Sequence, residues 1–429
     1  MTAGGVAALR REGTCHLVKM FVHLAGRGET SAGARHRTKT KPMQAPPHAL
    51  PTPFAGWTRR LLVSMLLPLA ALTLSGCATT DGTEAPDATV HGALDAAARR
   101  HHVCAAAIAV VRHGRLASTD AASGCSPAAA VTADSVFQAA SLGKPVFAYA
   151  VLKLARQGHI DLDAPVMTYL PQGYRHRFDP LRAEPVDVVT DPRLQAVTVR
   201  MLLNHTSGLP NWASGPLTFE ASPGTAWHYS GEGYLLLQRA VEAVTGQSLD
   251  EFMAAQVFGP LAMHDSSYVR NGRTTRDPVA GTKANGAPRA TMALTTPVAA
   301  FTLHTTAADY GRFLAALLDD EAVLKAVTAA PVEADRALGL GWGPGWGVED
   351  DAGERYLWQW GNNPGYRGFA IASPGTKDGL VLLTASENGL ALAEPVARKV
   401  MGGEHRLFRS PVLGTDVLTV LCNTVWLCL

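Results

Sequence analysis

The 429-residue chain has no uninterrupted run of 18 or more apolar residues, so a polytopic membrane protein is not expected. Charge is also sparse, at 17% of residues against 47% hydrophobic. Burial of so large an apolar fraction offsets the entropy of ordering the chain, which excludes disorder over most of its length. Only six cysteines are present, and their positions do not have the spacing of a metal site. The length is sufficient for a large core in one or several domains.

The small net charge of +2 hides an uneven distribution. Residues 1–76 carry ten basic and two acidic side chains, a net charge of +8, and the remainder carries 28 basic and 34 acidic side chains, a net charge of −6. A basic prefix on an acidic body is typical of a targeting segment. The acidic body gives no electrostatic basis for binding nucleic acid, so no nucleic-acid partner is expected.

The end of the basic prefix has the parts of a secretory signal. Arg59 and Arg60 precede the apolar stretch 61–74, and the small residues Leu-Ser-Gly then lead to Cys77. The Leu-Ser-Gly-Cys sequence resembles a bacterial lipoprotein box, which implies that Cys77 is lipidated and anchors the protein on the periplasmic side of a bacterial membrane. The alternative is an ordinary signal peptide in which the cysteine occurs by chance.

These features divide the chain into four parts. They are an N-terminal extension with the lipoprotein signal (1–76), a flexible tether (77–90), a folded domain (91–404) and a hydrophobic tail (405–429). Because the signal begins unusually far from the first residue, we expect Met43 to be the true start and residues 1–42 to be an artefact. The tail either docks on the domain or is a frame-shifted end.

The folded domain alternates between strand-like and helix-like patterns. A β-hairpin is expected at residues 105–121 around His113-Gly114, and residues 159–232 are expected to form loops and short helices. Apolar periodicity predicts strands at 338–343, 356–360, 368–373 and 379–386, and helices at 141–158, 234–246, 249–257, 307–318 and 390–400. Strands at both ends with helices between them indicate an α+β fold of the α/β/α kind, with a mostly antiparallel sheet flanked by helices and a helical insertion.

Cys104 and Cys125 flank the expected hairpin. An exported protein folds in an oxidising compartment, where neighbouring thiols form disulfides. A Cys104–Cys125 disulfide is therefore a hypothesis, and two free thiols are the alternative.

The sequence Ser141-Leu142-Gly143-Lys144 stands at the expected start of an apolar helix. Side chains three residues apart share a helix face, so the Ser141 hydroxyl and the Lys144 amine can meet. A serine hydroxyl attacks a carbonyl only when a base takes its proton, and a buried lysine with a lowered pKa can be that base. The alternative is a helix cap followed by a surface lysine.

Two later segments offer partners for this serine. Tyr229 precedes a helix in a glycine-rich turn, from which its phenol can relay protons across a cleft or simply pack at the helix entry. The run of residues 358–368, Trp-Gln-Trp-Gly-Asn-Asn-Pro-Gly-Tyr-Arg-Gly, combines a glycine in a strand with a strong turn signal. A backbone N–H at that strand edge can serve as an oxyanion donor.

The order of these segments resembles that of the class C β-lactamase-like serine hydrolases, which include class C β-lactamases, DD-peptidases, D-aminopeptidases and esterases. The resemblance spans residues 90–402 and depends on the segments 141–144, 202–209, 223–229 and 360–362. It implies a β-lactamase and penicillin-binding-protein fold. His205, within the second segment, is expected to be structural.

The resemblance also implies a role for each matching residue. Ser141 would be the acylated nucleophile, Lys144 its base or electrostatic activator, and Tyr229 the proton relay and deacylation base. The oxyanion N–H groups would come from Ser141 and Asn363, beside the substrate-binding residues Trp360, Gly361 and Asn362. No metal or cofactor is implied.

The chain departs from the family pattern at two points. The family's Tyr-x-Asn element is Tyr229-Ser230-Gly231, without the asparagine that binds substrate amides. Its Lys-Thr-Gly element is Trp360-Gly361-Asn362, without the cation that faces a penicillin carboxylate, unless Arg367 supplies one. Both departures favour an esterase, amidase or peptidase over an efficient β-lactamase.

We therefore expect an exported serine hydrolase that acts on small esters, amides or peptides through an acyl-enzyme on Ser141. One alternative is a β-lactamase or DD-carboxypeptidase of the same fold. Another is a catalytically silent envelope protein that uses the cleft for binding. The sequence leaves the substrate and the oligomeric state open.

Overall fold

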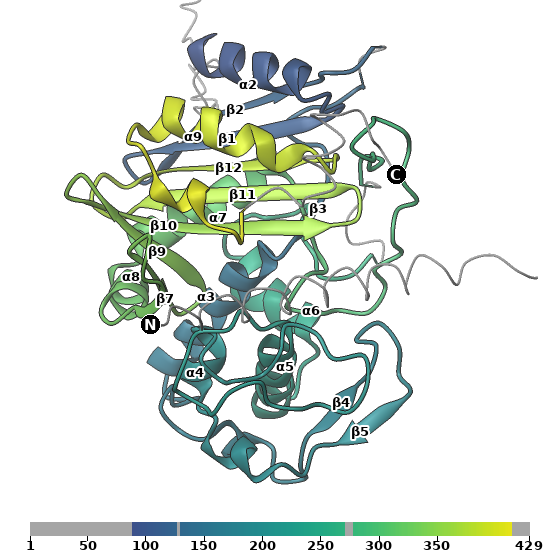
Figure 1. The fold of residues 1–429 in the computed structure, drawn as a ribbon, viewed down its shortest axis with the longest axis vertical. Helices are drawn as coiled ribbons and strands as arrows, with labels where there is room; N and C mark the ends of the chain where they lie inside the picture. The colour runs from purple at the N-terminus through teal and green to yellow at the C-terminus, as the bar shows by residue number, and fades with distance from the viewer. Residues whose placement is uncertain (1–87, 127–128, 271–277, 414–429) are drawn as a thin grey trace, which may run out of the picture. The chain divides into compact units, whose positions relative to one another are not determined.

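A computed structural model describes residues 88–126, 129–270 and 278–413 (Figure 1). The predicted signal, Cys77, the tether as far as residue 87 and the tail from residue 414 lie outside the described residues. No helix within the described ranges has the length and apolar character needed to cross a membrane.

The centre of the domain is an eight-stranded antiparallel sheet with the strand order β2-β1-β12-β11-β10-β9-β8-β7. Its strands are β1 (Ala106–Arg112), β2 (Arg115–Ala122), β7 (Val332–Asp335), β8 (Leu340–Gly343), β9 (Trp346–Asp351), β10 (Glu354–Asn363), β11 (Tyr366–Ser373) and β12 (Asp378–Thr384). β1 pairs with β12, so the N-terminal hairpin joins the late strands, as the sequence predicts. β7 and β9 were not predicted.

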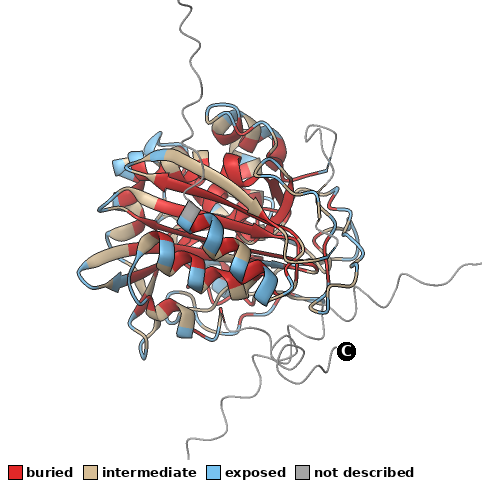
Figure 2. Ribbon diagram, turned by 90° about the horizontal axis from the view of Figure 1, so that it is seen from above, coloured by how far each residue is buried: buried red, intermediate tan, exposed pale blue. Residues whose placement is uncertain are grey.

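Helices cover both faces of this sheet. Ile108 and Val110 of β1 face a core shared with α2 (Ala88–Arg100) and α9 (Ala393–Met401). Ala107 and Ala109 of the same strand face the larger core on the other side. That larger core includes α7 (Ala307–Asp319), which packs on β1 and β12, α8 (Glu321–Thr328) and α3 (Gly143–Arg156). Figure 2 shows buried residues along the strands and the inward sides of the helices, which confirms the three-layer arrangement.

The helical insertion is confirmed as well. It lies between β3 (Phe137–Ala140) and β6 (Leu303–Thr305), which pair with each other in a separate two-stranded sheet. Besides α3, it contains α4 (Val199–Leu203), α5 (Gly231–Thr245), α6 (Leu249–Met253) and the short hairpin of β4 (Arg175–Arg177) and β5 (Val186–Val188). α4, α5, β4 and β5 occupy the lower part of Figure 1.

The folded region extends beyond the predicted boundaries at both ends. α2 begins at Ala88, within the stretch expected to be tether. His405 and Leu407 are fully buried, and the His405 Nδ1 lies 3.1 Å from a carboxylate oxygen of Glu349. Residues 405–413 therefore belong to the domain rather than to a tail. The sequence missed them because long-range contacts hold them, through Glu349 and the core positions Leu407 and Leu413, and no apolar period marks them in the sequence.

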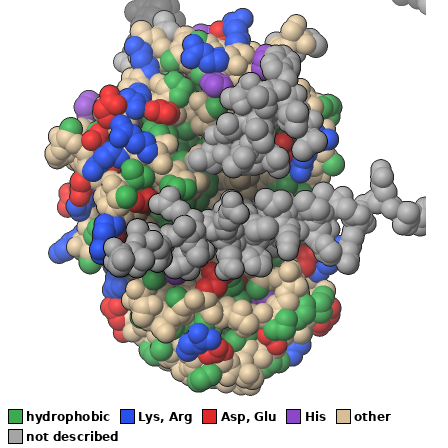
Figure 3. Space-filling model, in the orientation of Figure 1, with side chains coloured by type: hydrophobic (Ala, Val, Ile, Leu, Met, Phe, Trp, Pro, Cys, Tyr) green, Lys and Arg blue, Asp and Glu red, His purple; other side chains and the backbone are tan. Residues whose placement is uncertain are grey.

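The hypothesised disulfide is present. Cys104 and Cys125 are bonded to each other and lie just before β1 and just after β2, respectively. The bond therefore closes the open end of the N-terminal hairpin. Over the described part of the molecular face in Figure 3, basic and acidic side chains are interspersed.

Candidate active site

Ser141 lies in the tight connection between β3 and α3. Ala140 has a φ of +52°, a left-handed conformation that turns the chain sharply from strand to helix. The Leu142 N–H then donates to the Ala139 carbonyl at 3.1 Å. As a result Ser141 is partly exposed, whereas the eleven residues that follow it, 142–152, are all buried.

Two tyrosines fix the first turn of α3. The Tyr310 hydroxyl donates to the Leu142 carbonyl at 3.0 Å, and the Tyr268 hydroxyl donates to the Gly143 carbonyl. Both tyrosines are fully buried. Because the same turn carries the serine and the lysine, these bonds hold the two side chains in register.

Lys144 is a buried amine beside the serine hydroxyl. Its side chain is fully buried, and Nζ donates to the Ser141 Oγ at 3.0 Å and to the Ala300 carbonyl at 2.8 Å. Burial lowers the pKa of Lys144 to about 7, because the charged form loses its hydration. About half of the amines are then neutral at pH 7 and able to accept a proton. The alternative of a surface lysine is wrong.

Tyr229 completes the group. Burial raises the pKa of Tyr229, and hydrogen bonds from the Ser141 side chain and from Gln359 oppose that rise. The Gln359 Nε2 lies 3.5 Å from the phenol oxygen, and the Lys144 Nζ lies 4.8 Å from the centre of the phenol ring. The structure thus brings the hydroxyl and the amine at the start of α3 together with a phenol from a distant segment of the chain.

Aromatic rings hold the phenol in place. The Tyr229 ring lies between His205 and Trp360, with ring centres 4.3 and 4.8 Å away, and Trp342 meets it edge-on at 5.8 Å. The His205 Nδ1 accepts a hydrogen bond from the Ser230 N–H at 3.1 Å. Burial and the nearby Lys144 lower the pKa of His205 well below its ordinary value, so the ring is neutral. This geometry agrees with a structural role for His205.

β10 runs beside the nucleophile, and Gly361 allows the backbone of β10 to lie close to that of β3. A Cβ at Gly361 would lie 2.3 Å from the Ala139 carbonyl oxygen, so no larger residue fits there without displacing one of the strands. The Asn363 side chain is buried and donates to the Gln138 side chain and to the Phe301 carbonyl, each at 3.2 Å. Asn362 is exposed.

The hairpin register determines which N–H of this segment is free. Asn363 pairs with Tyr366 next to the two-residue turn, so its N–H is used across the hairpin. The next pair, Asn362 with Arg367, is a non-hydrogen-bonded pair, so the Asn362 N–H points away from β11. On that other side β9 pairs with β10 only as far as Trp358. The Asn362 N–H therefore points to an unpaired strand edge. This register corrects the expectation that Asn363 is the second oxyanion donor.

Arg367 does not have the role suggested for it. Its side chain is buried, and Nη1 donates to the carbonyls of Asn363 and Tyr366, both at 2.9 Å. The guanidinium thus braces the β10–β11 turn instead of facing a substrate carboxylate.

Sequence reasoning missed several contacts at the site. Gln359 lay within the Trp-Gln-Trp run, but nothing local indicated that its amide reaches the phenol. The contact of the Ala300 carbonyl with Lys144 uses a backbone atom, so no residue type in the sequence could indicate it. Trp212 and Phe301, both partly exposed, pack edge to face with ring centres 5.3 Å apart, next to the segment that holds Lys144.

Comparisons with known proteins agree with this geometry. A family model described as Beta-lactamase matches residues 87–401. The chain is 31% identical over 319 residues to Penicillin-binding protein 4 of Amycolatopsis lactamdurans, covering 64% of this chain and 76% of that protein. It is also 31% identical over 216 residues to Esterase EstB of Burkholderia gladioli, covering 42% of this chain and 51% of that protein.

Solved structures share the fold. D-alanine carboxypeptidase AmpC from Burkholderia cenocepacia aligns with a TM-score of 0.61 at 18% identity, over 73% of this chain and 97% of that chain. A D-stereospecific amidohydrolase from Streptomyces sp. aligns with a TM-score of 0.58 at 20% identity, over 73% of this chain and 98% of that chain. Taken together with the family match, these similarities show that the chain is a serine hydrolase that belongs to the beta-lactamase family.

Proposed function

We propose that the protein hydrolyses small esters or amides through an acyl-enzyme on Ser141. The observation that carries the proposal is the contact of the Ser141 hydroxyl with both a buried amine, 3.0 Å away, and a phenol. A hydroxyl with two proton-transfer partners is the arrangement that nucleophilic catalysis needs.

Lys144 and Tyr229 would share the proton transfers. In acylation, neutral Lys144 takes the Ser141 proton as the oxygen attacks the carbonyl carbon. Tyr229 passes its own proton to the leaving group as the ester or amide bond breaks, and it regains a proton from Lys144. In deacylation, water attacks the acyl carbon, gives its proton to this pair, and Ser141 departs with a proton restored to its oxygen.

The β10 register supports a specific oxyanion hole. The donors would be the N–H groups of Ser141 and Asn362. The close fit of Gly361 against β3 also supports aligning Gly361 with the glycine of the family's Lys-Thr-Gly element. That element then corresponds to Gln359-Trp360-Gly361, one residue earlier than the alignment made from the sequence. Gln359 then stands at the position of the cation, and its amide reaches Tyr229.

This alignment favours uncharged substrates. Gln359 carries no charge, and Arg367 is engaged in the turn. A substrate carboxylate would therefore meet no cation at that position, whereas Trp212 and Phe301 offer an apolar surface nearby. Neutral esters and amides with an apolar acyl group are the substrates that we propose. The similarity to a penicillin-binding protein makes D-alanyl peptides and β-lactams the second class to be tested.

The test is a panel of p-nitrophenyl esters, D-amino-acid amides, D-Ala-D-Ala peptides and a chromogenic cephalosporin. We expect ester turnover by the wild type and by Ser222→Ala, a change at an exposed serine, and none by Ser141→Ala. Peptide or cephalosporin turnover without ester turnover would replace the proposed substrate class. Equal turnover by Ser141→Ala would reject the mechanism.

We also propose that the protein is exported and lipid-anchored through Cys77. The Cys104–Cys125 disulfide supports export, because such bonds persist in oxidising compartments. The mature N-terminus from its native host should be a lipid-modified Cys77. A processed chain without lipid would instead indicate an ordinary signal peptide.

A further inference from the structure

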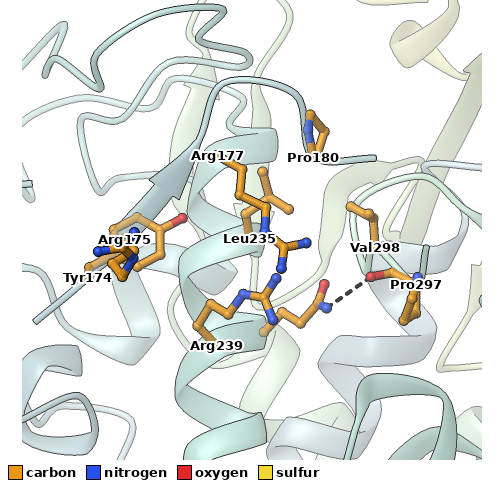
Figure 4. Close-up of a pocket in the computed structure, with 9 residues that line it drawn as sticks. Tyr174, Arg175, Arg177, Pro180, Leu235, Arg239, Pro297 and Val298 are labelled. Atoms are coloured by element: carbon orange, nitrogen blue, oxygen red, sulfur yellow. Dashed lines mark hydrogen bonds between the residues drawn. The ribbon is translucent and has the colours of Figure 1, made fainter. Parts of the chain in front are cut away.

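A pocket lies in the helical insertion, outside the serine site (Figure 4). It is formed by the β4 strand, one face of α5 and the chain at residues 297–298. Its polar lining is basic: Arg175 and Arg177 come from β4, and Arg239 comes from α5. No acidic residue is among the residues that line it.

Two of these arginines converge. In Figure 4 the guanidinium groups of Arg177 and Arg239 point toward each other across the pocket. Burial, and next the charge of Arg239, lower the pKa of Arg177 below its ordinary value. Two cations brought together in a partly dry pocket repel each other unless an anion lies between them.

Their counterions differ. Arg239 has a carboxylate partner in Glu242, with Nη1 and Oε2 2.6 Å apart. The Arg177 guanidinium makes no hydrogen bond or ion pair with the residues that the structure describes, although the charges of Glu242 and Glu184 act on it. The pocket therefore has positive charge that the protein itself does not fully neutralise.

We propose that this pocket binds a phosphate-class oxyanion, either inorganic phosphate or the phosphate group of a monoester, between Arg177 and Arg239. The planar guanidinium donates pairs of parallel N–H bonds that match phosphate oxygens. A dianion would also neutralise the two facing cations, which a single carboxylate does only in part.

The pocket wall is connected to the catalytic lysine. Gln238 lines the pocket, its Nε2 donates to the Pro297 carbonyl at 3.0 Å, and its Oε1 accepts from the Ala299 N–H at 2.9 Å. The next carbonyl along the chain, that of Ala300, accepts from the Lys144 Nζ. Anion binding thus stabilises the segment that holds the catalytic amine, and it does so without contact with Ser141.

The experiment is a titration with sodium phosphate at constant ionic strength, followed by melting temperature and by isothermal titration calorimetry. We expect saturable binding by the wild type and by Ser141→Ala, which separates this site from the proposed hydrolysis. Arg177→Gln and Arg239→Gln should each weaken binding at least tenfold. Arg336→Gln, at an exposed arginine paired with Glu333, should bind phosphate as the wild type does.

Two further arms make the outcome decisive. Glycerol phosphate that binds more tightly than phosphate would assign the site to a monoester, and equal or weaker binding would assign it to the free ion. Saturable binding of acetate or citrate without binding of phosphate would overturn the proposal. So would phosphate binding that is unsaturable or unchanged in Arg177→Gln.

A misfolded variant is distinguishable from a lost site. Arg177→Gln removes one of two repelling charges, so in phosphate-free buffer it should melt at or above the wild-type temperature. A clearly lower melting temperature there would contradict the repulsion from which the site is inferred.

Discussion

Lys144 shows how one residue's position sets its chemistry. The same side chain on the surface would be an ammonium at neutral pH and no base. Burial against two aromatic rings, with only a serine hydroxyl and one carbonyl as partners, leaves it close to half neutral at pH 7. The proposed mechanism depends on that balance, because only the neutral amine accepts the serine proton.

The first prediction is a pH profile. Since the proposed mechanism uses the neutral form of Lys144 and the pKa of that amine is about 7, kcat/KM for a neutral ester should rise with pH and level off above about pH 8. Below about pH 6 it should fall about tenfold per pH unit. Stopped-time hydrolysis of a p-nitrophenyl ester between pH 5 and 9 measures this. A flat profile, or a rise only near pH 10, would exclude Lys144 as the base.

The second prediction concerns stability. The pKa of Lys144 is lower in the folded chain, about 7, than its ordinary value of 10.5, so the unfolded chain binds more protons between these values and stability rises with pH across that window. Lys144→Met removes the cost of burying an amine. After the lost hydrogen bonds are allowed for, we expect a gain of about 1–3 kcal/mol in unfolding free energy at pH 7, with activity abolished.

Urea unfolding at pH 7 and at pH 10 checks this second prediction. The advantage of the methionine variant should shrink at the higher pH, because most of the window between about 7 and 10.5 has then been crossed and the wild type has regained most of the stability that it lacks at pH 7. A variant that is less stable than the wild type at pH 7 would show that the amine is not strained by burial.

At the scale of elements, the β10–β11 hairpin and the β3–α3 connection meet at one glycine. β3 packs against both β10 and β11, and Gly361 faces the Ala139 carbonyl just before the nucleophile. The approach of these two backbones places the proposed oxyanion edge next to Ser141.

The third prediction follows from that contact. Gly361→Ala should push β10 away from β3, lowering kcat/KM at least a hundredfold and the unfolding free energy by about 1–3 kcal/mol. Gly92→Ala is the control, because a Cβ at Gly92 in α2 meets nothing within 4 Å, and it should be neutral or slightly stabilising. Ester kinetics and urea unfolding of both variants decide the point. Wild-type kinetics in Gly361→Ala would remove β10 from the site.

Most of the long elements were predictable from local patterns. The hairpin of β1 and β2, the helices α3, α5 and α7, and the strands β10 to β12 each carry an apolar period of their own. β7, β9 and α8 were missed, because they are short or because packing, not periodicity, fixes them. The proposed oxyanion donor, Asn362, lies one residue before the predicted one, Asn363, since strand register depends on pairing across the turn, which a single segment does not reveal.

At the scale of the whole domain, early and late parts of the described chain pack together. β1 lies between β2 and β12 in the sheet, and α2 packs on α9, so elements from both ends of the described chain share one core. The sequence predicted the sheet built from both ends, but not that residues 405–413 complete this core. The fully buried Glu349 anchors them: one oxygen lies beside His405, and the other accepts from the Leu407 N–H at 2.9 Å.

The fourth prediction tests this anchor. His405→Ala leaves Glu349 with one fewer partner in the core, and it should lower the unfolding free energy by about 2–4 kcal/mol. His159→Ala, at an exposed position on the insertion, should change it by less than about 0.5 kcal/mol. Urea unfolding compares the two variants. Equal stability of both would mean that the contact between His405 and Glu349 does not stabilise the fold.

The most direct test of the central claim is mass spectrometry of the protein during turnover. Rapid acid quenching with a slowly hydrolysed ester should reveal a single added acyl group, which peptide mapping should locate on Ser141. Ser141→Ala should remain unmodified, and Lys144→Met should acylate far more slowly. An acyl group on another residue, or rapid turnover with no adduct in the wild type, would contradict the account.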